Sequence, residues 1–91
     1  MEIRVLKYFL TVAQEQSFSK AAKVLNVSQP ALSKQIKDLE EEYQITLFNR
    51  TTRSLSLTEE GRLFKEQAKQ IPVCRNIFLT FPILQAFQPV H

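Results

Sequence analysis

The fold is decided by residues 17–40, which read SFSKAAKVLNVSQPALSKQIKDLE. Asn26 and Ser28 stand in the middle of this stretch with a single residue between them. Asparagine tolerates the left-handed conformation that ends a helix, and serine accepts a hydrogen bond from an unpaired amide at the start of the next one. Pro30 follows in a first turn, where its missing N–H does no harm. The stretch therefore predicts two helices joined by a tight turn, a helix-turn-helix.

The first of these two helices is expected to begin at Ser19 as its N-cap and to end at Asn26, with Ala21 and Ala22 small enough to let the helices cross closely. The second helix is expected over residues 28–42. Its apolar residues recur at helical spacing and should anchor one side of it in the core; they are Leu32, Ile36, Leu39 and Tyr43.

The opposite side of this second helix carries short polar groups and ammonium groups. No acidic residue occurs between Glu15 and Asp38. A carboxylate there would face DNA phosphates, whereas short polar groups can approach base edges in a major groove wide enough for a helix. A solvated face is the alternative for a lone lysine pair, but the helix-turn-helix context favours DNA. The candidate contacts are Ser28, Gln29, Pro30, Ser33, Lys34 and Lys37.

The N-terminal segment predicts a helix from about Glu2 to Gln14. One apolar face contains Leu6, Phe9, Leu10 and Ala13. A second apolar stripe, formed by Val5, Tyr8 and Val12, makes the apolar arc unusually wide, so another helix should cover it.

A short hairpin is expected after the second helix. Leu47-Phe48 and Leu55–Leu57 are strand candidates, and residues 49–54 read NRTTRS, which suits the loop of a wing. Arg50 and Arg53 would then reach phosphates or an adjacent minor groove. For Arg50, next to the apolar Phe48, a structural ion pair is an equal alternative; for Arg53 the alternative is an exposed side chain without a partner.

A last helix is expected to open at Thr58 as its N-cap and to stop before Pro72. Gly61 would lie inside it, where glycine costs ~1 kcal/mol relative to alanine, so its presence indicates a close backbone approach. Phe64, Ala68 and Ile71 continue an apolar stripe that could cover the second face of the N-terminal helix.

Composition limits the possible functions. The chain has 91 residues, one cysteine and a net charge of +3, which suits one small domain with a polyanionic partner. Cys74 and His91 form no metal-binding cluster, and no nucleophile–base pair or phosphate loop is found, so we predict neither an enzyme nor a metal or other cofactor. No signal peptide or membrane span is expected, and a reducing cytoplasmic location is favoured.

The motifs SFSKAA, SQPALSKQI, LFNR and LTEEG occur here in the order and spacing of the N-terminal domain of LysR-type transcriptional regulators, which the chain resembles from Ile3 to about Lys69. The resemblance implies a mainly α winged helix-turn-helix with a three-helix core, a short two-stranded wing and a C-terminal linker helix through which members dimerise. It also implies groove contacts by Gln29, Pro30, Ser33 and Lys34 and a wing contact by Arg53.

Two features depart from the family pattern. Gln44 stands where the family usually has glycine, so that turn is expected to carry a small strain or to adopt a different geometry. Residues 72–91, PVCRNIFLTFPILQAFQPVH, bring three prolines and no usable heptad. We interpret this stretch as an atypical apolar tail, out of frame or truncated, with a disordered or loosely packed end as the alternative. No effector domain, and hence no small-molecule effector, is expected.

The sequence thus predicts a DNA-binding domain over residues 1–58, a linker and dimerisation helix over 59–71, and the tail. The predicted function is sequence-specific binding of double-stranded DNA as a weak homodimer, with helix 28–42 in the major groove and wing 49–54 on the backbone or minor groove. A DNA-free module that pairs with full-length relatives is the second hypothesis. The candidate dimer residues are Val5, Tyr8, Val12, Phe64, Ala68 and Ile71.

Overall fold

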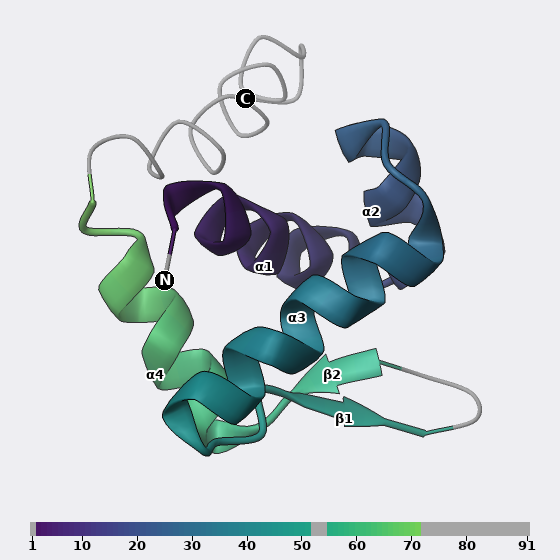
Figure 1. The fold of residues 1–91 in the computed structure, drawn as a ribbon. Coiled ribbons are helices and arrows are strands. Elements are labelled where there is room, and N and C mark those ends of the chain that lie inside the picture. Colours follow the sequence, from purple (N-terminus) through teal and green to yellow (C-terminus); the bar gives the residue numbers. More distant parts are fainter. Residues whose placement is uncertain (1, 52–54, 72–91) are drawn as a thin grey trace, which may run out of the picture.

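The computed structural model describes residues 2–51 and 55–71. Within these residues the chain forms four helices and one antiparallel hairpin, in the order α1 (Ile3–Glu15), α2 (Phe18–Leu25), α3 (Gln29–Tyr43), β1 (Phe48–Arg50), β2 (Leu55–Leu57) and α4 (Glu59–Ala68). Figure 1 shows the hairpin projecting from the helical body beside the C-terminal half of α3. The mainly α winged helix-turn-helix is confirmed. The expectations for Arg53 and for residues 72–91 lie outside the described residues.

The helix-turn-helix forms from local signals. Asn26 ends α2 with φ 59°, in the left-handed region, and the amide of Val27 closes the turn on the carbonyl of Ala22 at 3.0 Å. The Ser28 hydroxyl then accepts from the amide of Ala31 at 3.2 Å, so it caps α3 as predicted. Ala21 and Ala22 are buried where α2 meets its neighbours. Short side chains there let α2 and α3 lie close together.

The start of α2 differs from the prediction. Ser17 is the N-cap, and its hydroxyl accepts from the amide of Lys20 at 3.1 Å, whereas Ser19 lies exposed within the first turn. Ser17 and Ser19 are both acceptable caps by residue type, because each hydroxyl can accept a hydrogen bond two or three residues ahead. The left-handed Gln16 that ends α1, with φ 55°, brings the chain into α2 at Ser17.

The core surrounds α1, which packs against α2, α3 and α4. The Phe9 ring lies 5.4 Å from the ring of Phe48 in the wing and 5.1 Å from the ring of Phe64 in α4, measured between centroids. Helix α4 therefore packs against α1 through Phe64 and Phe9. Phe9 belongs to the first apolar face of α1, whereas α4 was expected to cover the second stripe. The largest side chains with less than 2% exposure are Leu6, Phe9, Leu10, Val12, Leu32, Ile36, Leu39 and Leu47.

Two predicted core features need correction. Tyr43 was expected to anchor α3 in the core, but it is 45% exposed, although its ring contacts Phe64 at 6.3 Å. The first strand runs over Phe48–Arg50 instead of Leu47-Phe48, and Leu47 is buried just before it. Arg50 pairs with Leu55, so Asn49 and Arg50 belong to the strand and not to the loop.

The turn after α3 has the left-handed backbone that favours glycine, so of the two expectations for Gln44 the structure shows the strained residue and not a different geometry. Gln44 has φ 53° and ψ 45°, which is the left-handed region that glycine occupies without cost. Its amide bonds back to the carbonyl of Glu41 at 3.2 Å, and the amide of Ile45 bonds to that of Glu40 at 3.0 Å. Helix α3 therefore ends in the usual left-handed C-cap, but a glutamine occupies the position that glycine usually takes.

Candidate nucleic-acid interface

Helix 3 separates its buried and exposed residues sharply. Leu32, Ile36 and Leu39 are buried against the core on one side. On the other side Gln29, Pro30, Lys34 and Lys37 are exposed, and Ser33 is half-buried. We call this exposed face, residues 28–30, 33, 34 and 37, the outer face of α3. Since its backbone is fixed by the core, its polar groups are presented on a rigid support.

The first turn of α3 determines which hydrogen-bonding groups of Ser28, Gln29 and Pro30 are available to a ligand. The Ser28 hydroxyl oxygen accepts the Ala31 amide hydrogen, so its hydrogen-bonding capacity as an acceptor is partly used. Its hydroxyl hydrogen remains available to a phosphate oxygen. Gln29 and Pro30 are the first residues of the helix, and both are exposed at the positively polarised N-terminus of α3.

Lys34 lies on the outer face but is not alone there. Its Nζ is 2.9 Å from Oδ2 of Asp38, one turn further along the helix. Hydrogen bonding to Asp38 and its negative charge raise the pKa of Lys34, so the ammonium stays protonated to higher pH. The expectation of a face without carboxylates thus holds for its N-terminal half and fails at Asp38. The i, i+4 spacing of Lys34 and Asp38 was visible in the sequence.

Arg50 takes the structural role that the sequence left open. Its Nη2 lies 3.1 Å from Oε1 of Glu40, and its guanidinium carbon lies 5.3 Å from the centre of the Phe18 ring. Glu40 is buried, with 8% of its surface exposed. Sequence reasoning missed Glu40, because ten residues separate it from Arg50 and a run of three glutamates gives no sign of which one turns inward.

The candidate dimer residues are distributed unevenly. Val12 is completely buried in the protomer, and Val5 and Ala68 are also buried, so these side chains support the core and have almost no surface for a partner. Tyr8, Phe64 and Ile71 are half-buried. Contacts between protomers through these residues stay a prediction, and Val5 and Val12 offer a partner almost no accessible surface in this conformation.

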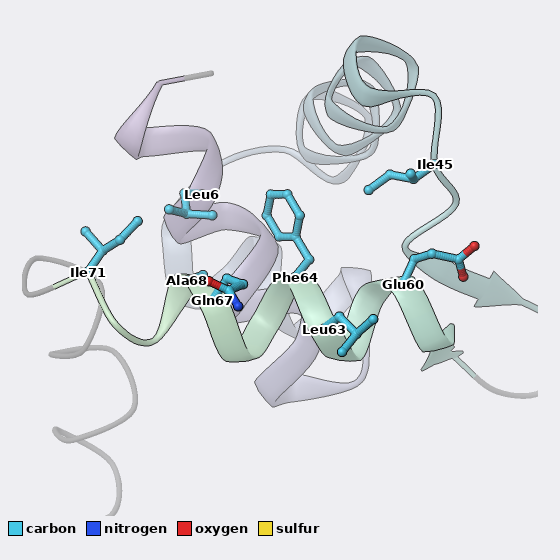
Figure 2. Close-up of a pocket in the computed structure, with 8 residues that line it drawn as sticks. All are labelled: Leu6, Ile45, Glu60, Leu63, Phe64, Gln67, Ala68 and Ile71. Atoms are coloured by element: carbon cyan, nitrogen blue, oxygen red, sulfur yellow. The ribbon is translucent and has the colours of Figure 1, made fainter.

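An apolar groove lies between α4, α1 and the end of α3, with a volume of about 630 Å³. Figure 2 shows Phe64 standing in this groove between Leu6 of α1 and Ile45, with Leu63 further out on α4. Leu63 is 63% exposed, more than any other large apolar side chain in the described part of the chain. The residues that line the groove are Leu6, Ile45, Glu60, Leu63, Phe64, Gln67, Ala68 and Ile71.

Other kinds of site find little support in the described residues. No three acidic, cysteine or histidine side chains gather there as they would around a metal ion. None of the helices in residues 2–51 and 55–71 has the length and apolar character that crossing a bilayer requires.

Residues 3–62 match the family described as bacterial regulatory helix-turn-helix protein, lysR family. The chain is 55% identical over 71 residues to the HTH-type transcriptional regulator BudR of Klebsiella aerogenes, which covers 78% of this chain and 50% of BudR. It is 49% identical over 72 residues to the HTH-type transcriptional regulator BsdA of Bacillus subtilis (strain 168), covering 78% of this chain and 25% of BsdA. The chain thus spans a quarter to a half of the length of these relatives.

The fold is similar to solved structures of the same family. The structure of BenM DBD in complex with catB site 1 DNA has a TM-score of 0.77 and 40% identity, and the match covers 97% of this chain and 98% of that chain. Full-length CbnR in complex with its target DNA has a TM-score of 0.75 and 35% identity, over 94% of this chain and 29% of that chain. The chain therefore belongs to the LysR family of bacterial regulatory helix-turn-helix proteins, as a transcriptional-regulator domain and not an enzyme.

Proposed function

We propose that this chain binds double-stranded DNA in a sequence-specific manner, as the DNA-binding part of a LysR-type transcriptional regulator. The observation that carries the proposal is the outer face of α3, which is exposed and polar while Leu32, Ile36 and Leu39 hold the opposite side in the core. The likeness to BenM DBD, whose structure is a complex with catB site 1 DNA, supports DNA binding by this chain at 40% identity. A cytoplasmic location goes with such a partner.

The outer face divides into two kinds of contact. Gln29 and Ser33 have amide and hydroxyl groups that suit base edges in the major groove. Lys34, Lys37 and the hydroxyl of Ser28 suit phosphates, which set the register of the helix on the duplex without reading sequence. Pro30 adds a rigid apolar surface for a thymine methyl group. All except the half-buried Ser33 are exposed, so α3 needs no rearrangement to enter a groove.

The wing is proposed to contact the backbone or the minor groove through Arg53, at residues 49–54. The β1–β2 hairpin begins next to the C-terminal half of α3, so a duplex that accepts α3 in its major groove runs past the wing. Arg50 is no longer needed as a DNA contact in this proposal, because its guanidinium is already paired with Glu40.

Selection of bound sequences from random DNA, followed by titration of the selected duplex over a salt series, tests the proposal. Neutralising phosphates releases counterions, so log affinity should fall linearly with log salt at a slope of about −0.9 per phosphate contact. A scrambled duplex of equal length is the control and should bind more weakly. Absence of binding at low salt would instead favour the second hypothesis, a module that acts only by pairing with relatives.

A homodimer is proposed to form through the apolar groove and the exposed side of α4. The groove is open, and its lining residues Leu63 and Gln67 point outward from the short helix, which has ten residues. A dimer would place two copies of α3 on successive turns of one DNA face. Because α4 is short, we expect the dimer to be weak and concentration-dependent.

Sedimentation equilibrium tests the dimer. Leu63→Glu should shift the protein to monomer, because it puts a charge into the groove's exposed rim while Leu63 supports no core contact that would unfold the chain. Val24→Glu is the matched control, since Val24 is also apolar, helical and 51% exposed but lies on α2. Equal dissociation by both variants, or a tight tetramer in the unaltered chain, would contradict this surface.

A further inference from the structure

The carboxylate of Glu40 joins α3 to the base of the wing. Glu40, near the C-terminal end of α3, accepts a hydrogen bond through Oε2 from the amide of Leu47 at 2.7 Å and a longer one from the amide of Phe48 at 3.3 Å. Its other oxygen, Oε1, accepts from Nη2 of Arg50 at 3.1 Å. Three donors, from the wing's first strand and the residue just before it, therefore converge on a single side chain of α3.

The other end of the link is also fixed. The guanidinium of Arg50 lies over the ring of Phe18, the first residue of α2, at 5.3 Å from the ring centre. The same ring meets the ring of Phe48 edge-on at 5.8 Å between centroids. The base of the hairpin is thus held between a carboxylate from α3 and an aromatic ring from α2, the two helices of the helix-turn-helix.

Burial of this group indicates what it contributes. The Glu40 side chain is 10% exposed and that of Arg50 is 38% exposed. Withdrawing a carboxylate from water is costly, and a buried ion pair often contributes no more net stability than apolar residues of similar size. The pair instead fixes the orientation of the wing residues relative to α3, because hydrogen bonds to a carboxylate restrict the angles at which its partners can lie.

We propose that Glu40 is a positioning residue for DNA binding, which fixes the wing relative to the outer face of α3 so that both reach one duplex together. This inference rests on the proposed function, because it takes α3 and Arg53 as the DNA contacts. A hairpin whose base is already held in place loses less conformational freedom when DNA binds, and affinity rises accordingly.

Glu40→Gln is the substitution that tests it. Glutamine keeps the size of the side chain and one acceptor for the Leu47 amide, but its amide nitrogen is a donor and cannot accept from Arg50. Glu41→Gln is the matched control, one residue further along α3 and exposed. In the DNA-free protein, Glu40→Gln should speed hydrogen exchange at the amides of Leu47 and Phe48 while those of α1 remain protected.

DNA binding is then measured in a double-mutant cycle with Arg53→Ala. Each single substitution should weaken binding by on the order of tenfold, and Arg53→Ala should have little further effect in the Glu40→Gln background, because a misdirected wing has already lost its contact. A role in stability alone predicts independent, multiplied losses instead, so additivity in the cycle would overturn the inference. Unchanged exchange at Leu47 and Phe48 would overturn it as well.

The same experiments distinguish failure of the proposed function from failure of the inference about Glu40. If the unaltered chain binds no DNA, the proposed function itself fails. If it binds but Arg53→Ala has no effect, the wing contact is wrong, and Glu40 has nothing to position. Should Glu40→Gln not fold, Glu40→Met enters the same cycle, because apolar replacement of a buried ion pair is often tolerated for stability. Additive losses with a folded Glu40→Met would count against the inference.

Discussion

The backbone carbonyl oxygen of Leu47 lies directly against Gly61 in the first turn of α4. A Cβ atom built on Gly61 would collide with this oxygen and would also press on Cδ2 of Leu57 at 3.0 Å. The oxygen cannot easily move away, because it accepts the amide of Thr58 at 3.0 Å. The glycine that the sequence marks as unusual is therefore required by the close approach of α4 to the segment that enters the wing.

Gly61→Ala should destabilise the fold by about 2 kcal/mol or more, because the clash is with a fixed backbone atom and exceeds the ~1 kcal/mol that alanine gains in a helix. Urea unfolding followed by circular dichroism measures the change. Gln67→Ala, at an exposed position of the same helix, is the control and should change stability by less than about 0.5 kcal/mol. Similar stability of Gly61→Ala and the unaltered chain would contradict the close approach.

Ser17 and Ser19 form a matched pair for testing the start of α2. Ser17→Ala should cost about 1 kcal/mol, because it removes the acceptor for the Lys20 amide. Ser19→Ala should be neutral or slightly stabilising, since Ser19 is exposed and alanine is the better helix former. Thermal unfolding of the two variants checks the order; a larger loss from Ser19→Ala would restore the boundary expected from the sequence.

Gln44→Gly should stabilise the protein by about 0.5 to 1 kcal/mol, because relief of the left-handed backbone exceeds the cost of the greater conformational entropy that glycine gives the unfolded chain. Glu41→Gly is the control, an exposed position inside α3 where glycine should cost about 1 kcal/mol. Denaturant midpoints distinguish the two. A loss of stability in both variants would show that Gln44 makes contacts worth more than its strain.

The ion pair of Lys34 and Asp38 should make a contribution to stability that depends on pH in a specific way. The pKa of Lys34 is raised in the folded chain by its hydrogen bond and attraction to Asp38. The pair's contribution is therefore fully present below the ordinary pKa of lysine and is lost as pH rises through the raised value. DNA affinity should not fall through loss of the Lys34 charge between about pH 6 and pH 9.

The titration of Lys34 by NMR, in the unaltered chain and in Asp38→Asn, checks this assignment. Removing the carboxylate should lower the midpoint for Lys34 and raise affinity for random DNA modestly, because the ammonium is then free for phosphate and one repelling charge is gone. Glu66→Gln, distant on α4, is the control and should leave the Lys34 midpoint unchanged. An unshifted Lys34 in Asp38→Asn would rule out the pair in solution.

Groove reading and phosphate anchoring should separate by mutation. Gln29→Ala and Ser33→Ala should relax sequence preference, each by about 1 to 3 kcal/mol of discrimination between the correct and a wrong base. Lys37→Ala should weaken all sequences alike and reduce the salt slope by about 1. Competition binding with single-base variants of the selected duplex is the measurement. If Lys37→Ala changed the preferred sequence and Ser33→Ala did not, the assigned roles would be reversed.

The sequence by itself determined the parts of this protein that depend on neighbours along the chain. Asn26, Ser28 and Pro30 set the turn of the helix-turn-helix, because helix ends are governed by the amides and dihedral angles of a few adjacent residues. The spacing of Leu32 and Ile36 identified the buried side of α3, and with it the exposed outer face, because one helical period relates them.

Only the tertiary structure decided which residues meet across the chain. Val12 could not be distinguished from a dimer contact, nor Glu40 from its glutamate neighbours, because periodicity gives the face of a helix but not what packs on it. The Glu40 carboxylate turns inward because the segment entering the wing brings the Leu47 and Phe48 amides and the Arg50 guanidinium to it. These partners lie seven to ten residues further along the chain. A charged side chain can be buried only where the fold brings hydrogen-bond donors to it.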